Sequence, residues 1–148
     1  MPRLLLVHHT PSPAMAAILG AVQEGIAMVE EVEVVLRPAL SAGAADVLTA
    51  DGVLLGTPAN IGYMSGALKH FFDTVYYPCL DETRGRPFGY WIHGNSDTSG
   101  TERQLLSITT GLAWAKAADP VIATGEPDKK VLEACTELGG TLAATLMS

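Results

Sequence analysis

Residues 54–72 read LLGTPANIGYMSGALKHFF, and this stretch decides the fold. The apolar run at 52–56 predicts a strand buried on both faces, because its hydrophobicity is continuous and does not alternate. A loop rich in small and polar residues follows. Ser65 then precedes a helical pattern of apolar residues, which Pro78 is expected to end. A buried strand followed by a polar loop and an amphipathic helix is typical of a β-α-β unit.

The same alternation continues along the chain in both directions. Near-continuous apolar runs predict further strands at 3–8, 32–37 and 88–93, and a weaker one at 120–123. Ser12 can cap a helix with Pro13 in its first position, where a missing N–H costs nothing. Ser99 and Glu102 have the spacing of a capping box. The remaining helices are expected at 43–49 and at about 128–147, with either a soft or a closely packed point at Gly139 and Gly140.

These elements predict an α/β fold of three layers, in which helices cover both faces of a five-stranded parallel sheet. Residues 1–148 are expected to form a single domain, because no repeat, low-complexity tract or linker interrupts them. Right-handed crossovers restrict the topology, and five strands suit the order 2-1-3-4-5. Ligands of such sheets bind where the strand order reverses, which places a site at the loops 9–15, 57–65 and 94–101.

Composition and charge exclude several classes of protein. Nine Lys and Arg against sixteen Asp and Glu give a net charge of −7, which opposes binding to nucleic acid. The longest apolar run near the start, 4–7, is too short for a signal peptide or a membrane span, so a cytoplasmic protein without membrane contact is expected. Cys79 and Cys135 lack zinc spacing and are expected to be packing residues.

Hydrolysis and metal binding are also disfavoured. No histidine follows His93, so a nucleophile elbow at 94–97 cannot complete the order serine, acid, histidine. His8 and His9 are adjacent on a strand and point to opposite faces, so they cannot chelate together. His9 and His93 are expected to meet at the ligand crevice, in contact with the ligand or in a structural hydrogen bond. We predict no metal site and no catalytic acid or base.

Residues 51–73 (DGVLLGTPANIGYMSGALKHFFD) resemble the second flavin loop and the following helix of NAD(P)H-dependent FMN reductases with a flavodoxin-like fold. This group includes the quinone reductases named tryptophan-repressor-binding proteins. The similarity extends to 4–15 (LLLVHHTPSPAM) at the phosphate-loop position and to 87–102 (PFGYWIHGNSDTSGTE) at the third loop. It therefore covers nearly the whole chain, and the middle segment is the most specific part.

The resemblance implies a flavoprotein with FMN as cofactor, its phosphate on the first loop and its isoalloxazine ring between the second and third. A helix N-terminus suits phosphate, and Thr10 and Ser12 add hydroxyl groups. Thr57 and Asn60 would offer polar atoms to the ring edge, and Gly62 would let the backbone approach closely. The candidate FMN-binding residues are His9, Thr10, Ser12, Ala14, Met15, Thr57, Pro58, Ala59, Asn60, Ile61, Gly62, Tyr63, Gly94, Asn95, Ser96 and Asp97.

As an activity, the resemblance implies an oxidoreductase that passes hydride from NAD(P)H through the flavin to a small oxidised acceptor such as a quinone. The chain has no G-x-G-x-x-G motif, so NAD(P)H would bind transiently over the ring. Homo-oligomers are common among such proteins. Residues 75–78, Trp91 and Trp114 are candidates either for an interface or for the core.

The first and third loops of the expected site differ from the sequence pattern of the family. Its phosphate loop reads S/T-x-T-G-x-T, but here Pro13 has no N–H and Met15 has no hydroxyl. Each lost hydrogen bond to the phosphate would cost about 1.5 to 3 kcal/mol, so affinity would fall by about two to four orders of magnitude. In the third loop Asp97 either begins a helix or selects against an anionic second substrate. Two alternatives therefore stand beside the reductase: a flavodoxin-type carrier of single electrons, and a flavodoxin fold that no longer holds flavin tightly.

Overall fold

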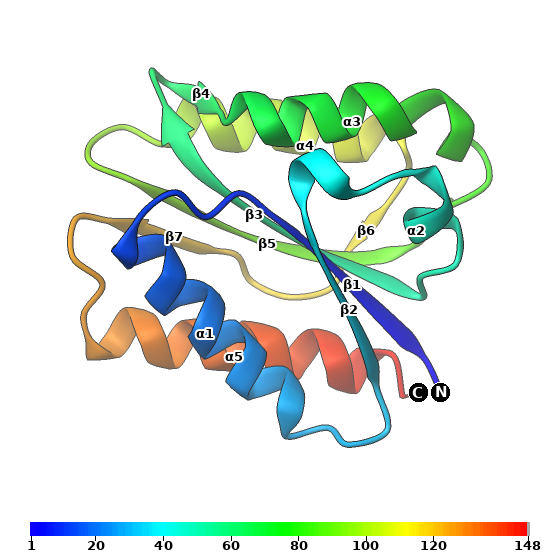
Figure 1. The fold of residues 1–148 in the computed structure, drawn as a ribbon, viewed down its shortest axis with the longest axis horizontal. Coiled ribbons are helices and arrows are strands. Elements are labelled where there is room, and N and C mark those ends of the chain that lie inside the picture. Colours follow the sequence, from blue (N-terminus) through cyan, green and yellow to red (C-terminus); the bar gives the residue numbers. More distant parts are fainter. Residues whose placement is uncertain (148) are drawn as a thin grey trace.

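The computed structural model describes residues 1–147 and arranges them in three layers (Figure 1). Parallel strands run in the order β2-β1-β3-β5-β6, and β7 also pairs with β5. The short β4 is antiparallel to the end of β3. The strands are β1 (Arg3–His8), β2 (Glu33–Pro38), β3 (Gly52–Asn60), β4 (Tyr63–Met64), β5 (Pro87–Gly94), β6 (Ala115–Lys116) and β7 (Val121–Thr124).

Helices cover both faces of this sheet (Figure 1). One face packs against α1 and α5, and the other packs against α3 and α4, with α2 beside them. The helices are α1 (Pro13–Ala27), α2 (Ala44–Leu48), α3 (Gly66–Cys79), α4 (Ser99–Gly111) and α5 (Lys129–Thr145), with a 3₁₀ turn at Ala39–Ser41. The predicted sandwich and its strand order are confirmed when β6 and β7 are taken together as the fifth strand. Pro78 lies inside the last turn of α3, which ends at Cys79.

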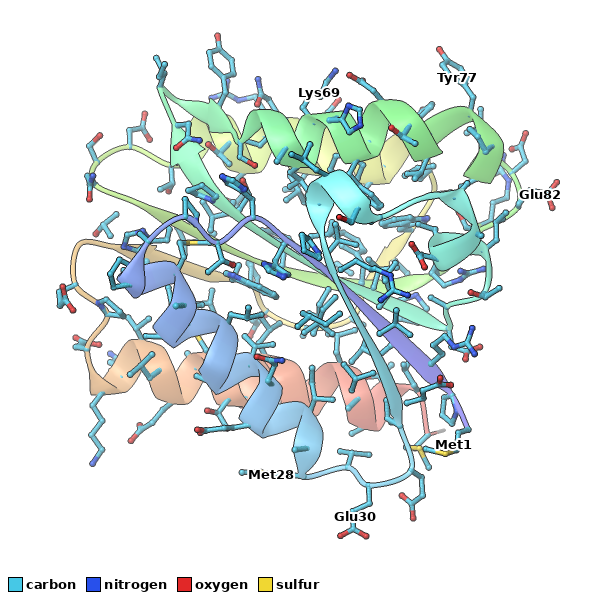
Figure 2. All side chains as sticks on the ribbon, viewed as in Figure 1. Met1, Met28, Glu30, Lys69, Tyr77 and Glu82 are labelled. Carbon is cyan, nitrogen blue, oxygen red and sulfur yellow. The ribbon has the colours of Figure 1, made fainter. Side chains whose placement is uncertain are left out.

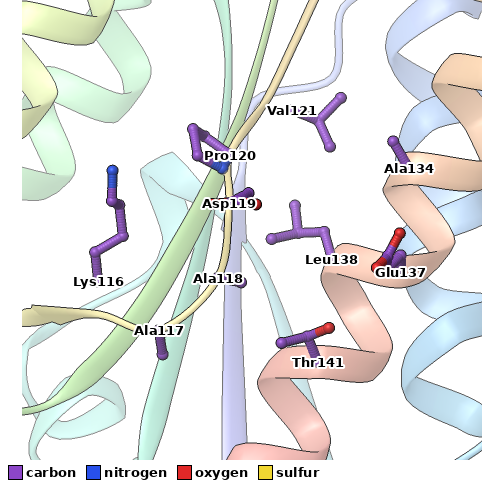
Figure 3. Close-up of a pocket in the computed structure, with 10 residues that line it drawn as sticks. All are labelled: Lys116, Ala117, Ala118, Asp119, Pro120, Val121, Ala134, Glu137, Leu138 and Thr141. Carbon is purple, nitrogen blue, oxygen red and sulfur yellow. The ribbon is translucent and has the colours of Figure 1, made fainter.

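The fifth strand is split into two pieces on the open edge of β5. Pro87 and Phe88 pair with β6, and residues 91–94 pair with β7. Between these pieces the chain leaves the sheet at residues 117–120, and a cavity of about 600 Å³ separates it from α5 (Figure 3). The sequence predicted this strand at 120–123, but Pro120 lies just outside β7. The two-residue strands β4 and β6 were not predicted.

The helices α1 and α5 approach each other backbone to backbone. A Cβ atom added to Gly25 would lie 1.9 Å from the Thr136 carbonyl oxygen, and one added to Gly139 would lie 2.1 Å from the Val22 carbonyl oxygen. These glycines therefore allow a contact that any side chain would prevent. Close packing, one of the two alternatives predicted at Gly139, is confirmed.

Both tryptophans, whose place the sequence left open, lie in the core. Trp91 and Trp114 are buried, so they are core residues and not interface residues. The Trp114 Nε1 donates a hydrogen bond to Thr83 Oγ1 over 2.8 Å, which satisfies its polar atom. Cys79 and Cys135 are free and buried, as predicted for packing residues. Within residues 1–147, no helix has the length and hydropathy that a membrane crossing requires.

Candidate functional site

A cavity of about 450 Å³ opens at the carboxyl ends of the strands, between the loops that follow β1, β3 and β5. This volume lies within the usual range for small-molecule sites. The loop after β7 also contributes, although the sequence reasoning considered only three loops. The lining residues are Pro11, Ser12, Pro13, Ala14, Pro58, Ala59, Asn60, His93, Gly94, Asn95, Gly125 and Glu126.

The N-terminus of α1 forms one wall of this cavity. Ser12 is its N-cap, and the Ser12 Oγ accepts a hydrogen bond from the Met15 N–H over 3.2 Å. Pro13 occupies the first position of the helix, as predicted. The Ala16 N–H donates to the Ser12 carbonyl oxygen, which leaves the Ala14 N–H without a partner among residues 1–147. A helix terminus with a hydroxyl and an open N–H group fits an anionic ligand group.

Three candidates from this part of the chain lie outside the cavity lining. Met15 is fully buried beneath α1, because its position in the helix faces the sheet. Thr10 Oγ1 lies 2.7 Å from His8 Nδ1 in a hydrogen bond, so its hydroxyl is already engaged. The pKa of its partner His8 is lowered, mainly by burial and to a smaller extent by the charge of the neighbouring His9. His9 donates its backbone N–H to the Gly56 carbonyl oxygen.

The second loop, which the sequence marked only as rich in small and polar residues, forms a β-hairpin. β3 continues through Pro58 to Asn60 and pairs with β4, so Ile61 and Gly62 form the tip. Both tip residues have positive φ, 51° and 77°, which is typical of a tight two-residue hairpin turn. The Ile61 side chain is 96% exposed there. Gly62 is therefore explained by backbone conformation, since an added Cβ would meet no atom within 4 Å.

Thr57 braces this hairpin and does not face the cavity. It is completely buried, its Oγ1 accepts a hydrogen bond from the Ser65 N–H over 3.0 Å, and its hydroxyl donates to the Pro58 carbonyl oxygen over 2.8 Å. Both hydrogen-bonding capacities of its hydroxyl are thus engaged within the hairpin, and Thr57 is absent from the cavity lining. Its neighbours Pro58, Ala59 and Asn60 do line the cavity.

The third loop contributes its first two candidates, Gly94 and Asn95, to the cavity, whereas Ser96 and Asp97 lie outside the lining and are exposed. Asp97 Oδ1 accepts a hydrogen bond from the Ser99 N–H over 2.9 Å. This bond from the backbone lowers the pKa of Asp97. Asp97 thus lies just before α4 and accepts a backbone N–H at the start of that helix, where a carboxylate is favourable.

The predicted capping box of α4 is wrong. Thr98 is the N-cap of the helix, and Ser99 is its first residue. Glu102 Oε2 instead accepts a hydrogen bond from the Tyr90 hydroxyl over 2.6 Å. Burial, together with this carboxylate, raises the pKa of Tyr90. The acid is used to satisfy a buried hydroxyl on β5, and sequence spacing cannot distinguish this role from capping.

His93 lines the cavity, as its expected place at the ligand crevice suggests, whereas the cavity residues Gly125 and Glu126 were missed. The position of Gly125 and Glu126 directly after the weak fifth strand was an available signal, because carboxyl ends of parallel strands meet at one edge. The His93 Nε2 lies 2.6 Å from the Gly125 carbonyl oxygen. His93 therefore forms a structural hydrogen bond, which is one of its two expected roles, whereas His9 is not among the residues that line the cavity.

A second hollow of about 610 Å³ lies between α3, α4 and the hairpin. Tyr63 belongs to this groove and not to the first cavity, and it is 59% exposed. Lys69 and Arg103 are its basic residues, and the Lys69 Nζ lies 2.7 Å from Asp73 Oδ1. Lys69 and Tyr77 project outward from α3 (Figure 2). Residues 1–147 contain no group of three or more His, Cys, Asp or Glu side chains arranged to hold a metal ion.

The chain matches one family model and is similar to a protein of known name. Residues 14–126 match the family model described as NADPH-dependent FMN reductase. The chain is 30% identical over 159 residues to a protein named flavodoxin from Aquifex aeolicus (strain VF5), covering 97% of this chain and 86% of that protein.

Solved structures agree with the strand order and the layers. A flavodoxin from the domain Archaea superposes with a TM-score of 0.84 at 17% identity, covering 99% of both chains. A WrbA-like flavodoxin from Agrobacterium tumefaciens has a TM-score of 0.78 at 19% identity, covering 99% of this chain and 98% of that chain. At these identities the structures establish the flavodoxin-like fold alone. The family match covers residues 14–126, which is more than half of the chain, and it shows that the chain belongs to the NADPH-dependent FMN reductase family.

Proposed function

We propose that this protein binds FMN in the cavity at the carboxyl ends of the strands and acts as a flavodoxin-type electron carrier. Ser12 and Ala14 would hold the phosphate, because a hydroxyl and an open N–H group lie there at the N-terminus of α1. Residues 58–60 and 94–95 would flank the rest of the ligand. When bound, FMN supplies the redox chemistry, while the protein positions it and sets its surroundings.

The charges that line the cavity favour an electron carrier over a reductase. The ionisable side chains that line it are His93 and Glu126, so no permanent cation faces it from residues 1–147. NAD(P)H is strongly anionic, and a protein of net charge −7 opposes its approach. A carrier needs no such substrate. An acidic carrier is instead steered toward basic protein partners, which the exposed Ile61 beside the cavity could contact.

One observation favours a second candidate, an NAD(P)H-dependent oxidoreductase. The groove between α3 and α4 brings Lys69 and Arg103 to the far side of the hairpin from the first cavity, next to Tyr63. Phosphate groups of a dinucleotide could be neutralised there. The description of the matching family points to the same activity. In this reading Arg103→Gln would raise the KM for NADPH, whereas FMN binding would not change.

The first experiment is a fluorescence titration of flavin-stripped protein with FMN and, in parallel, with riboflavin. Saturable FMN binding that exceeds riboflavin binding supports the phosphate position. NADPH and NADH are then added without oxygen to the FMN-loaded protein. A carrier leaves the flavin absorbance unchanged and shows two separate one-electron potentials in a redox titration. Rapid bleaching by NADPH supports the reductase instead. If FMN does not bind, the third reading stands, in which the fold has lost its flavin.

A further inference from the structure

His93 places an ionisable ring in the wall of the FMN cavity. It lies at the carboxyl end of β5, is 9% exposed, and lines the cavity with Ser12 and Ala14. Its Nε2 is 2.6 Å from the Gly125 carbonyl oxygen. A carbonyl oxygen only accepts hydrogen bonds, so Nε2 carries the hydrogen. In the neutral ring the other nitrogen, Nδ1, then bears a lone pair.

That second nitrogen is unpaired and not sealed from solvent. Nδ1 has no hydrogen-bond partner among residues 1–147. Within the same residues, the buried side-chain nitrogen and oxygen atoms that lack a partner and are sealed from solvent are Trp91 Nε1 and Thr101 Oγ1. His93 Nδ1 is not sealed in this way, and the hollow that His93 lines is the cavity. A ligand can therefore reach Nδ1.

The N-terminus of α1 has few donors left for a phosphate. Pro11 and Pro13 have no N–H, and Ser12 itself already accepts the N–H groups of Met15 and Ala16. The Ser12 N–H, the Ala14 N–H and the Ser12 hydroxyl remain. These are neutral groups, whereas a phosphate ester carries close to two negative charges at neutral pH. The missing positive charge has one source in the cavity lining, which is His93.

We propose that His93 selects FMN over unphosphorylated flavin by taking up a proton at Nδ1 when the phosphate binds. This inference rests on the proposed FMN site. The Nδ1–H then donates to a phosphate oxygen, while the Nε2–H remains on the Gly125 carbonyl. Charge-assisted hydrogen bonds of this kind are stronger than neutral ones.

Other charged groups around the ring modify this equilibrium. Glu126, in the same cavity, favours the imidazolium and opposes the phosphate. The positive end of α1 favours the phosphate. His9 follows β1, Asp97 precedes α4, and Asp128 Oδ1 accepts the Val131 N–H at the start of α5, beside Lys129 and Lys130. These outer groups lie outside the cavity lining, so solvent screens them more than it screens Glu126.

The test is calorimetric titration at pH 7.5 in two phosphate-free buffers of different ionisation enthalpy, which measures proton uptake. FMN should bind with uptake of a fraction of a proton, and riboflavin with none. In His93→Gln the amide can still donate to the Gly125 carbonyl but cannot become charged, so uptake should disappear. The FMN-over-riboflavin affinity ratio should then fall by about 10- to 100-fold. His70→Gln, an exposed histidine on α3, is the matched control and should behave as wild type.

The outcomes separate this inference from the function on which it rests. FMN preference without proton uptake, or equal uptake in His93→Gln, overturns the role of His93 and leaves the FMN site standing. Failure of both flavins to bind the wild type removes the site itself. If His93→Gln does not fold, ¹⁵N NMR of the wild-type imidazole decides the matter. FMN at pH 7.5 should protonate Nδ1, and an unchanged neutral tautomer would contradict the proposal.

Discussion

The Ser65 N–H donates a hydrogen bond to Thr57 Oγ1 over 3.0 Å, which ties the beginning of α3 to the base of the β3–β4 hairpin. The Thr57 hydroxyl also donates to the Pro58 carbonyl oxygen. One buried side chain therefore bonds to residues on both sides of the hairpin, whose first strand lines the cavity with residues 58–60. Its removal should affect the stability of the fold and the shape of the site together.

Thr57→Val should lower the free energy of unfolding by about 1 to 3 kcal/mol, because the buried Ser65 N–H loses its acceptor while the volume is almost unchanged. FMN affinity should fall as well. Urea unfolding measures the first effect, and flavin fluorescence measures the second. Thr57→Ser keeps the oxygen and is the control. Equal stability of the valine and serine variants would show that this hydrogen bond contributes little.

Ser12 should have two separable roles, since it caps α1 and lines the cavity. Ser12→Ala should cost about 1 kcal/mol of stability through loss of the cap and should weaken FMN binding. Ser12→Asp keeps a capping side chain but places a carboxylate at the proposed phosphate position. It should retain near wild-type stability, bind riboflavin normally and lose FMN. Unchanged FMN binding by Ser12→Asp would move the phosphate elsewhere.

Two glycines of the same helix give a matched pair for the contact between α1 and α5. Gly25→Ala should destabilise the protein by about 1 to 3 kcal/mol, because its Cβ would lie 1.9 Å from the Thr136 carbonyl oxygen and the helices must separate. Gly20→Ala meets no atom within 4 Å and should stabilise by about 0.5 to 1 kcal/mol. Denaturant unfolding measures both. We expect one cooperative transition in each, since we propose that residues 1–148 fold as a single unit.

The stability of the protein should fall between pH 9 and pH 11 through Cys135. Burial raises the pKa of its thiol from 9.0 to about 11. Above pH 9 the unfolded chain releases this proton while the folded protein keeps it, so the free energy of unfolding decreases. The decrease is at most about 1.4 kcal/mol per pH unit. Urea unfolding of wild type and Cys135→Ala across this range isolates the effect, because other alkaline groups titrate in both proteins. Parallel pH profiles would exclude it.

Most of the fold could be predicted from the sequence because each element carries its own local signal. Ser12 and Pro13 determine the beginning of α1, and the continuous apolar runs of β1, β3 and β5 mark strands covered on both faces. The run at 32–37 also forms a strand, but β2 lies at the edge of the sheet and is mostly exposed. The two-residue strands β4 and β6 could not be predicted, because so few residues show no periodicity. Their existence depends on the tertiary pairing of β3 and β5.

The site was predicted less completely, because sequence identifies loops but not the directions of side chains. Ser12, Asn60 and Asn95 line the cavity as expected. Thr57 lies outside the lining, and the sequence could not show this because a hydroxyl in a polar loop has the same sequence signal whether it faces a ligand or the backbone of its own hairpin. Glu102 was misassigned for the same reason, since a buried Tyr90 hydroxyl competes for its carboxylate.

The break in the fifth strand has a consequence for how copies of this chain can meet. An uninterrupted edge strand would offer its free N–H and C=O groups to a neighbouring molecule and invite edge-to-edge aggregation. Here residues 117–120 divide that edge, and Pro120 has no N–H to donate. At the opposite edge β2 ends at Pro38 and carries the charged Glu33 and Arg37. Both features limit the backbone groups that this sheet can offer to a second copy of the chain.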